Sequence, residues 1–233
     1  MNKKREQILY DEIFCRNSIG KEEQEKIRKT VFGLIGLGGV GGFVFENLIR
    51  LGAEKFIIFE YERFDLSNLN RQVLATINEI DRKKDAVAIE RAININPRIK
   101  KENIEIRGEF FKSSSVKGCD VLIDGSDNLK TRILASKISK KQKIPYVFAS
   151  ANDSRGMISV LIGKTLDEVL KMPKDAADRF EVCSSILSPA AAISGSLAAS
   201  EALKLVLKKP IIKAPKFLFF DLFSENPFWI KSI

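Results

Sequence analysis

Histidine is absent from this 233-residue sequence, and cysteine is scarce. Without histidine, Ser-His-Asp and Cys-His catalysis, histidine metal sites and imidazole acid-base chemistry are all excluded. The three cysteines, Cys15, Cys119 and Cys183, form no C-x-x-C pair. One chain therefore cannot build a four-cysteine zinc site, and we expect neither zinc nor a disulfide scaffold. Catalysis must rest on cationic side chains, carboxylates, amides and at most a thiol.

Long apolar runs are also missing. None approaches the roughly 20 residues that cross a bilayer, and no apolar segment follows the basic start M-N-K-K-R-E-Q-I-L-Y. We therefore predict a cytoplasmic protein with no signal peptide and no membrane partner. Lys and Arg exceed Asp and Glu by 39 to 30, which gives a formal charge of +9. Such a charge attracts nucleotides, acidic proteins or RNA, but the basic residues are spread along the chain and do not favour a dedicated nucleic-acid site.

Short apolar segments alternate with helical ones over the first two thirds of the chain. After a charged helix at 21–29, we predict buried strands at 31–35, 55–60, 103–107, 119–124 and 144–150. Between them we predict helices with apolar faces at Val40, Val44, Leu48 and Leu51, at 81–94 with Ala86, Ile89 and Ile93 inward, and at 127–141. This alternation is typical of a parallel sheet with helices on both faces.

The pattern changes after Ala151. Residues 155–162 alternate in polarity and predict antiparallel pairing, 164–187 are irregular, 188–207 form a helix, and two strands close the chain as a hairpin-like edge. The expected fold is Rossmann-like α/β, mostly parallel, with an antiparallel C-terminal extension. We expect one domain over 1–233, with an N-terminal arm and helix (1–29), a nucleotide-binding core (30–150) and a C-terminal part (151–233).

A glycine-rich loop, G-L-G-G-V-G at 36–41, lies between the first strand and the first core helix. In G-x-G-x-x-G the first glycine permits the turn, the second lets a phosphate approach, and the third lets the helix pack on the strand. These are Gly36, Gly38 and Gly41, and Gly39 lies between them. Glu60 follows Gly41 by 19 residues, at the end of the second strand, where an acid accepts hydrogen bonds from ribose hydroxyls. The sequence therefore predicts a nucleotide site.

A polar segment, E-R-F-D-L-S-N-L-N-R-Q at 62–72, is followed by Lys83-Lys84 at the start of the next helix. Both should lie at the carboxyl edge of the sheet and surround phosphates with Asn68, Arg71, Gln72 and Lys84. Hydride transfer needs little charge there, whereas a phosphate under nucleophilic attack needs a great deal. Asp127, in D-G-S-D-N, would face the same crevice and hold the magnesium that accompanies ATP, or else cap the following helix.

These motifs together resemble the ThiF/MoeB/HesA adenylyltransferases, relatives of the ubiquitin-activating enzymes. The resemblance rests on G-L-G-G-V-G, S-N-L-N-R-Q, the following lysine, D-G-S-D-N and the small-residue helix G-S-L-A-A-S-E-A-L-K-L, and runs from about Arg16 to the C-terminus. It implies that the C-terminal glycine carboxylate of a ubiquitin-like or sulfur-carrier protein attacks the α-phosphate of ATP·Mg²⁺. The products would be an acyl-adenylate and pyrophosphate.

The resemblance also implies individual roles. Glu60 would hold the ribose; Asn68, Arg71, Gln72 and Lys84 would hold the phosphates, and Asp127 the magnesium. Arg16 would reach into the site of a partner subunit, which implies a homodimer. Cys183 lies near the reactive cysteine of the family.

Three features depart from the family pattern. Glu60 and Glu62 replace its usual aspartates, Asp81 stands where glycine is common, and the zinc-binding cysteine pairs of many members are missing. Alternatives therefore remain open. One is a tRNA threonylcarbamoyladenosine dehydratase, another an NAD-dependent oxidoreductase, which would leave Asn68, Arg71 and Lys84 without a role, and a third a non-catalytic scaffold.

Overall fold

The computed structural model describes residues 11–110, 116–173 and 185–233. Its strands form a single sheet in the order β3-β2-β1-β4-β5-β6-β7-β8. Pairing is parallel from β3 to β5 and antiparallel from β5 to β8, which confirms the predicted mixed sheet. The strands are β1 (Val31–Ile35), β2 (Lys55–Phe59), β3 (Ile104–Ile106), β4 (Val121–Asp124), β5 (Tyr146–Asn152), β6 (Arg155–Leu161), β7 (Lys216–Asp221) and β8 (Phe228–Ser232).

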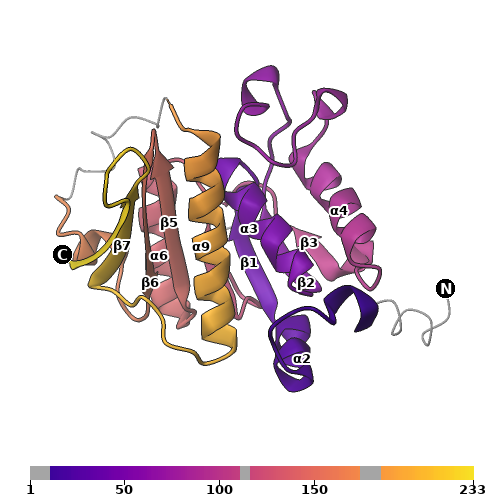
Figure 1. Cartoon of the computed structure of the whole chain (residues 1–233), viewed down its shortest axis with the longest axis horizontal. Coiled ribbons are helices and arrows are strands. Elements are labelled where there is room, and N and C mark those ends of the chain that lie inside the picture. The colour runs from indigo at the N-terminus through magenta and orange to yellow at the C-terminus, as the bar shows by residue number, and fades with distance from the viewer. Residues whose placement is uncertain (1–10, 111–115, 174–184) are drawn as a thin grey trace.

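Helices cover both faces of this sheet (Figure 1). One face carries α3 (Gly39–Arg50), α4 (Lys84–Ile95) and α9 (Ser188–Val206), and the other carries α6 (Leu129–Gln142) and the short α7 (Leu166–Val169). The helix α2 (Lys21–Lys29) precedes β1, and the 3-10 turns are η1 (Leu66–Asn68), η2 (Ile77–Glu79) and η3 (Lys101–Asn103). The predicted Rossmann-like layering is therefore present.

The two apolar layers follow from the alternation within the strands. In β2, Phe56 and Ile58 belong to the core under α3 and α4, whereas Ile57 and Phe59 belong to the core under α6. Each such side chain, when fully buried, contributes about 1.5–3 kcal/mol. Because both faces are covered, the strand reads as a continuous apolar run, which explains why the sequence signal was clear.

A change of direction between β1 and β4 creates the site. The chain leaves β1 into α3 on one face of the sheet and leaves β4 into α6 on the other, while β1 and β4 are neighbours in it. In register, Ile35 pairs with Phe59 of β2 and with Asp124 of β4. The three strands thus end at one level, and such a switch point leaves a crevice beyond their carboxyl ends.

The structure corrects some predicted details. Helix α4 begins at Lys84, three residues later than predicted, and its buried side is formed by Val87, Ala88 and Ala92, with Ile93 41% exposed. Of the predicted inward residues, Ile89 packs against the core and Ala86 is partly buried, so the prediction was wrong at Ile93. The small Ala88 and Ala92 are fully buried in the core on this face of the sheet, where close packing favours small side chains.

Helix α9 lies directly against α3, side by side with it in Figure 1. A Cβ at Gly195 would lie 2.5 Å from Phe43 Cβ, so the two helices approach too closely for any other residue there. Glu201 on α9 is buried, and its carboxylate accepts a hydrogen bond from the Ile212 amide at 2.8 Å. Neither α9 nor any other helix in the described ranges is long and apolar enough to cross a membrane.

Candidate functional site

A cavity of about 220 Å³ lies beyond the carboxyl ends of β1, β2 and β4. It receives residues from the glycine loop, β2, the 62–72 segment, α4, the β4–α6 loop and the end of β5. The lining residues include Gly36, Gly38, Gly39, Glu60, Tyr61, Glu62, Arg71, Gln72, Lys84, Glu109, Phe110, Asp127, Asn128, Thr131, Arg132, Ala151 and Ile186. Most of the residues predicted for the nucleotide site are thus brought together.

The glycine loop is built by close approach of three backbone segments. Gly36 has φ 80°, in the left-handed region that favours glycine. A Cβ at Gly41 would overlap the carbonyl oxygen of Gly36, and one at Gly125 would lie 2.6 Å from Gly41 Cα. Beside Gly38, by contrast, a Cβ would meet only Gln72 Nε2, at 3.7 Å. The first turn of α3 therefore presents its amides to the cavity with no side chain in between, a favourable place for an anion.

Glu60 is tied to the backbone around it. Its side chain is buried; Oε2 accepts a hydrogen bond from the Leu37 amide at 2.7 Å, and Oε1 accepts from the Tyr61 and Glu62 amides at 2.7 and 2.8 Å. A carboxylate has about four acceptor positions, so one on Oε2 is left for a ribose hydroxyl. The glutamate side chain, one methylene longer than the aspartate usual in the family, hydrogen-bonds the Leu37 amide and so holds the glycine loop in place.

Two cations stand at the same cavity. Lys84, 3% exposed, is the first residue of α4, and its Nζ donates to Glu62 Oε2 at 2.6 Å. An ammonium has three donors, so two are left for a ligand. Arg71 is held in place by Nη1, which donates to the Ser67 carbonyl at 2.6 Å and to Asn70 Oδ1 at 2.9 Å. Both are oriented before any ligand arrives.

Gln72 and Asn68 take different positions. Gln72 is 7% exposed, lines the cavity, and its buried Oε1 has no hydrogen-bond partner. A buried amide oxygen without a partner is unfavourable, so this wall suits a polar ligand. Asn68 is buried but does not line the cavity; its Oδ1 accepts from the Asp65 amide at 3.4 Å, and its carbonyl accepts from the amides of Arg71 and Gln72. It shapes the loop that carries the other two.

Asp127 is exposed and lines the cavity from the loop between β4 and α6. The cap of α6 is Asn128, whose Oδ1 accepts from the Thr131 amide at 2.8 Å. The alternative role of Asp127 as helix cap is therefore wrong, and its carboxylate is left to the cavity. The predicted helix at 127–141 begins two residues later for the same reason.

Asp81 has φ 65°, in the left-handed region that favours glycine and that aspartate tolerates better than most residues. Its amide donates to the Phe64 carbonyl at 2.9 Å, and its carbonyl accepts from Arg63 Nη1 at 2.5 Å. This turn delivers Lys84 to the cavity. The departure from glycine therefore leaves the required backbone in place.

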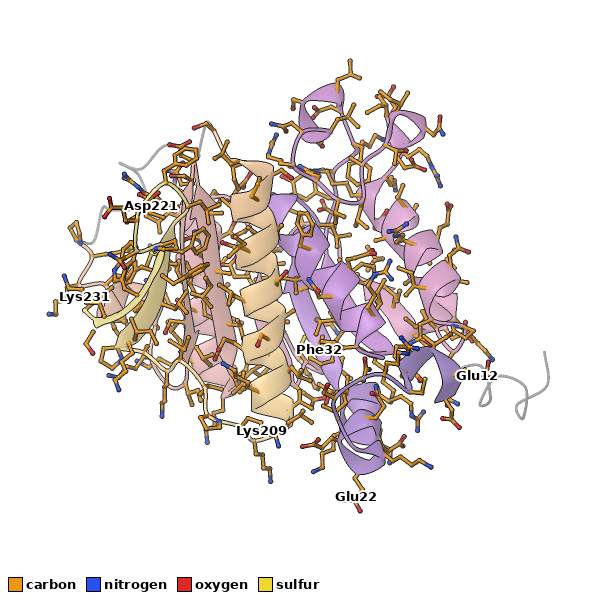
Figure 2. All side chains as sticks on the ribbon, viewed as in Figure 1. Glu12, Glu22, Phe32, Lys209, Asp221 and Lys231 are labelled. Atoms are coloured by element: carbon orange, nitrogen blue, oxygen red, sulfur yellow. The ribbon has the colours of Figure 1, made fainter. Side chains whose placement is uncertain are left out.

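Arg16 is not part of this arrangement. Arg16 is exposed and does not line the cavity. The nearby Glu12 lies at the same end of the molecule as Glu22 of α2, whereas the loops that follow β2 stand at the opposite end (Figure 2). Cys183 lies outside the described residues.

The structure adds residues that sequence reasoning missed. Arg132, Thr131 and Asn128 come from the start of α6, and Phe110 packs its ring on Phe59 at a centroid distance of 4.9 Å. Arg132 is one of many basic residues in a helix with a weak apolar face, so no pattern singled it out.

Two tyrosines at the cavity, one in its wall and one beneath it, have raised pKa values. Burial, followed by the nearby carboxylates of Glu62 and Glu109, raises the pKa of Tyr61. Beneath the floor, the hydroxyl of Tyr146 donates to Asp124, and burial together with that carboxylate raises the pKa of Tyr146 well above its usual range. Tyr146 is therefore a neutral donor at any physiological pH.

Comparison with known proteins places this geometry in context. The model of the ThiF family matches residues 10–232. A sulfur carrier protein adenylyltransferase of Thermus thermophilus is 29% identical over 81% of this chain and 73% of its own length. A molybdopterin-synthase adenylyltransferase of Haemophilus influenzae is 27% identical over 95% of this chain and 93% of its own. The structure of the Microcin C7 biosynthetic enzyme MccB in complex with N-formylated MccA matches with a TM-score of 0.75 at 18% identity, covering 91% of this chain and 66% of that one.

Proposed function

This chain belongs to the ThiF family, and we propose that it is an ATP-dependent adenylyltransferase. Its acceptor is the C-terminal glycine carboxylate of a small ubiquitin-like or sulfur-carrier protein. In support, the Thermus thermophilus relative is named as an adenylyltransferase of a sulfur carrier protein. The proposal includes a homodimer and a cytoplasmic location, both expected from the sequence.

One observation carries the proposal. Arg71, Gln72 and Lys84 line the same cavity as the glycine loop and Glu60. Neither of the two cations, Arg71 and Lys84, is neutralised by a buried carboxylate. Glu62, the partner of Lys84, has a half-exposed side chain, so a phosphate can share or displace it. A dinucleotide used for hydride transfer would leave this charge without a role.

The reaction follows from these positions. An oxygen of the acceptor carboxylate attacks the α-phosphorus of ATP, the bond from that phosphorus to the bridging oxygen breaks, and pyrophosphate leaves with the electron pair. The carboxylate is ionised at neutral pH, so the step needs no general base, which suits a chain without histidine. Arg71 and Lys84 stabilise the charge that develops on the phosphate oxygens, and Glu60 fixes the ribose.

Magnesium fits the residues present. The described residues contain no group of three carboxylate or cysteine ligands, and Asp127 faces the cavity with only a 3.5 Å contact from Asn128 Nδ2. Mg²⁺ commonly takes one or two protein carboxylates and completes its shell with water and substrate phosphates. Asp127 would hold it, and the ion would neutralise charge on the phosphates. No zinc role is proposed.

Exchange of labelled pyrophosphate into ATP tests the function. We expect exchange when the protein is given a carrier that ends in Gly-Gly, and none with ATP alone. Carriers, tRNA and NADH are assayed in parallel. Exchange only with tRNA would instead support the dehydratase, a change in NADH absorbance without exchange would support the oxidoreductase, and ATP binding with no turnover would support a scaffold.

A further inference from the structure

Arg132 lies on the α6 side of the cavity, across the sheet from α3 and α4. Its side chain is 14% exposed, its guanidinium carbon stands 5.3 Å from the centre of the Phe148 ring, and Nη2 donates to the Ser126 carbonyl at 2.6 Å. Its Nε is buried and has no hydrogen-bond partner. The cavity therefore has a third cation that the nucleotide roles above do not use.

The nearest carboxylate forms an ion pair with this cation but no hydrogen bond. Asp124 Oδ2 is 3.9 Å from Arg132 Nε, outside hydrogen-bond distance. Asp124 is itself held by the Ser126 amide at 2.9 Å, the Ser126 hydroxyl at 2.6 Å and the hydroxyl of Tyr146. It cannot turn toward Arg132 without breaking those bonds. A largely buried, poorly paired charge is unfavourable, so an anion in the cavity would stabilise it.

The position of Arg132 indicates which anion. The glycine loop, Arg71 and Lys84 account for the phosphates on the side of α3 and α4. Arg132 enters the same cavity from α6. The cavity is also lined by Ala151 at the end of β5 and by Ile186, which pack with the core under α3 and α9. Small and apolar walls beside a cation suit the end of an extended chain of small residues, with its carboxylate on the cation.

We propose that Arg132 binds the attacking carboxylate of the acceptor, an assignment that rests on the proposed function. The planar guanidinium matches a carboxylate with two parallel donors, and its terminal nitrogens present them because Nε is buried. The bond to Ser126 and the ring of Phe148 fix its orientation. Arg132 thus directs one carboxylate oxygen toward the α-phosphate that Arg71 and Lys84 hold from the other face.

Binding of two matched probes tests this assignment. N-acetyl-glycylglycine and its C-terminal amide differ only in the carboxylate, and ligand-observed NMR measures their affinities in the presence of a non-hydrolysable ATP analogue. We expect the wild-type protein to prefer the acid by about tenfold or more. In Arg132→Met, which keeps the length and the packing on Phe148, we expect the preference to disappear while nucleotide affinity is retained.

Two further variants serve as controls. Arg132→Lys should keep part of the preference, because it retains the charge without the planar pair of donors. Lys141→Ala, an exposed position near the end of the same helix, should change nothing. Equal affinity of the wild type for acid and amide, or an unchanged preference in Arg132→Met, would overturn the assignment. So would a parallel loss of nucleotide affinity, which would make Arg132 a phosphate ligand. Failure of the proposed function is distinct, because it appears as absent pyrophosphate exchange in the wild type.

Discussion

At the scale of single residues, the two cations proposed to contact the phosphates have different kinds of hydrogen-bond partner. Lys84 is paired with Glu62, while Arg71 is fixed only by neutral oxygens. Replacing either with alanine should lower the pyrophosphate exchange rate by about 100-fold, since a donor acting on transition-state charge contributes about 3 kcal/mol. ATP affinity, measured by calorimetry, should fall far less. Equal losses of rate and affinity would mean that these residues bind only the ground state.

The cysteines give a second prediction at this scale. Burial raises the pKa of Cys119 to about 12, whereas Cys15 is exposed. The thiolate is the reactive form, so at pH 8 Cys119 should be inert in the folded protein. In a Cys183→Ala background, mass spectrometry after iodoacetamide should show one adduct on native protein and two after unfolding. Two adducts on native protein would contradict the burial of Cys119.

The pH dependence of stability has a definite sign here. Folding raises the pKa of Cys119, so the folded state disfavours its thiolate. The contribution to stability is complete below the pKa of the unfolded thiol, near 8.5, and decreases as the pH rises from there toward the folded value.

The sequence predicted much of the site because its residues are adjacent in motifs. Gly36, Gly38, Gly39, Glu60, Arg71, Gln72 and Lys84 line the cavity as expected, whereas Gly41 does not line it and packs against Gly36 and Gly125. Asn68 was indistinguishable by type from a ligand, yet its carbonyl and amide serve the loop. Arg132 was missed because its proposed role depends on hydrogen bonds that hold the Asp124 carboxylate to Ser126 and Tyr146. Such contacts exist only in the folded structure and leave no pattern in the sequence.

At the scale of elements, apolar strands buried on both faces were readable, whereas helix faces and ends were less so. In helix α4, tertiary packing buries Ala88 and Ala92 and leaves the larger Ile93 exposed. Helix α6 begins after Asn128 because that side chain bonds to the Thr131 amide, and Asp127 offered an equally plausible cap in the sequence.

The β1–α3 connection gives a prediction at this scale. Gly41→Ala should destabilise the protein by about 3 kcal/mol, because its methyl group would overlap the Gly36 carbonyl and neither backbone segment can yield easily. Gly39→Ala is the matched control two residues earlier in the same helix, where a methyl group would find only ordinary contacts at 3.5 Å or more. Urea unfolding followed by circular dichroism measures both. Similar midpoints for the two variants would show that the loop can relax.

At the scale of the whole molecule, the two ends of the sheet are occupied differently. The site lies at the carboxyl ends of the strands, whereas α2 and the segment with Glu12 lie at the other end, near Phe32 at the start of β1 (Figure 2). Arg16 is exposed and does not line the cavity of its own chain. If it serves a nucleotide, that nucleotide belongs to another copy.

Subunit mixing tests this arrangement. Arg16→Ala and Asp127→Ala should each be inactive alone, and exchange of subunits should restore activity to about a quarter of the wild-type level. In a mixed dimer one of the two sites has both residues intact, and random exchange makes half of the dimers mixed. A mixture that stays inactive, with mixed dimers demonstrated by native mass spectrometry, would exclude action across the interface.

The three amides held by Glu60 have a consequence for the thermodynamics of nucleotide binding. Leu37, Tyr61 and Glu62 belong to the loops that would contact the ribose and phosphates, and one buried carboxylate locks them together in the empty protein. Little backbone freedom remains to be lost when a ligand enters, so the entropic penalty of ordering a loop is largely met during folding. The nucleotide should thus bind to a preorganised site, whose selectivity comes from the shape of the empty protein and not from rearrangement on binding.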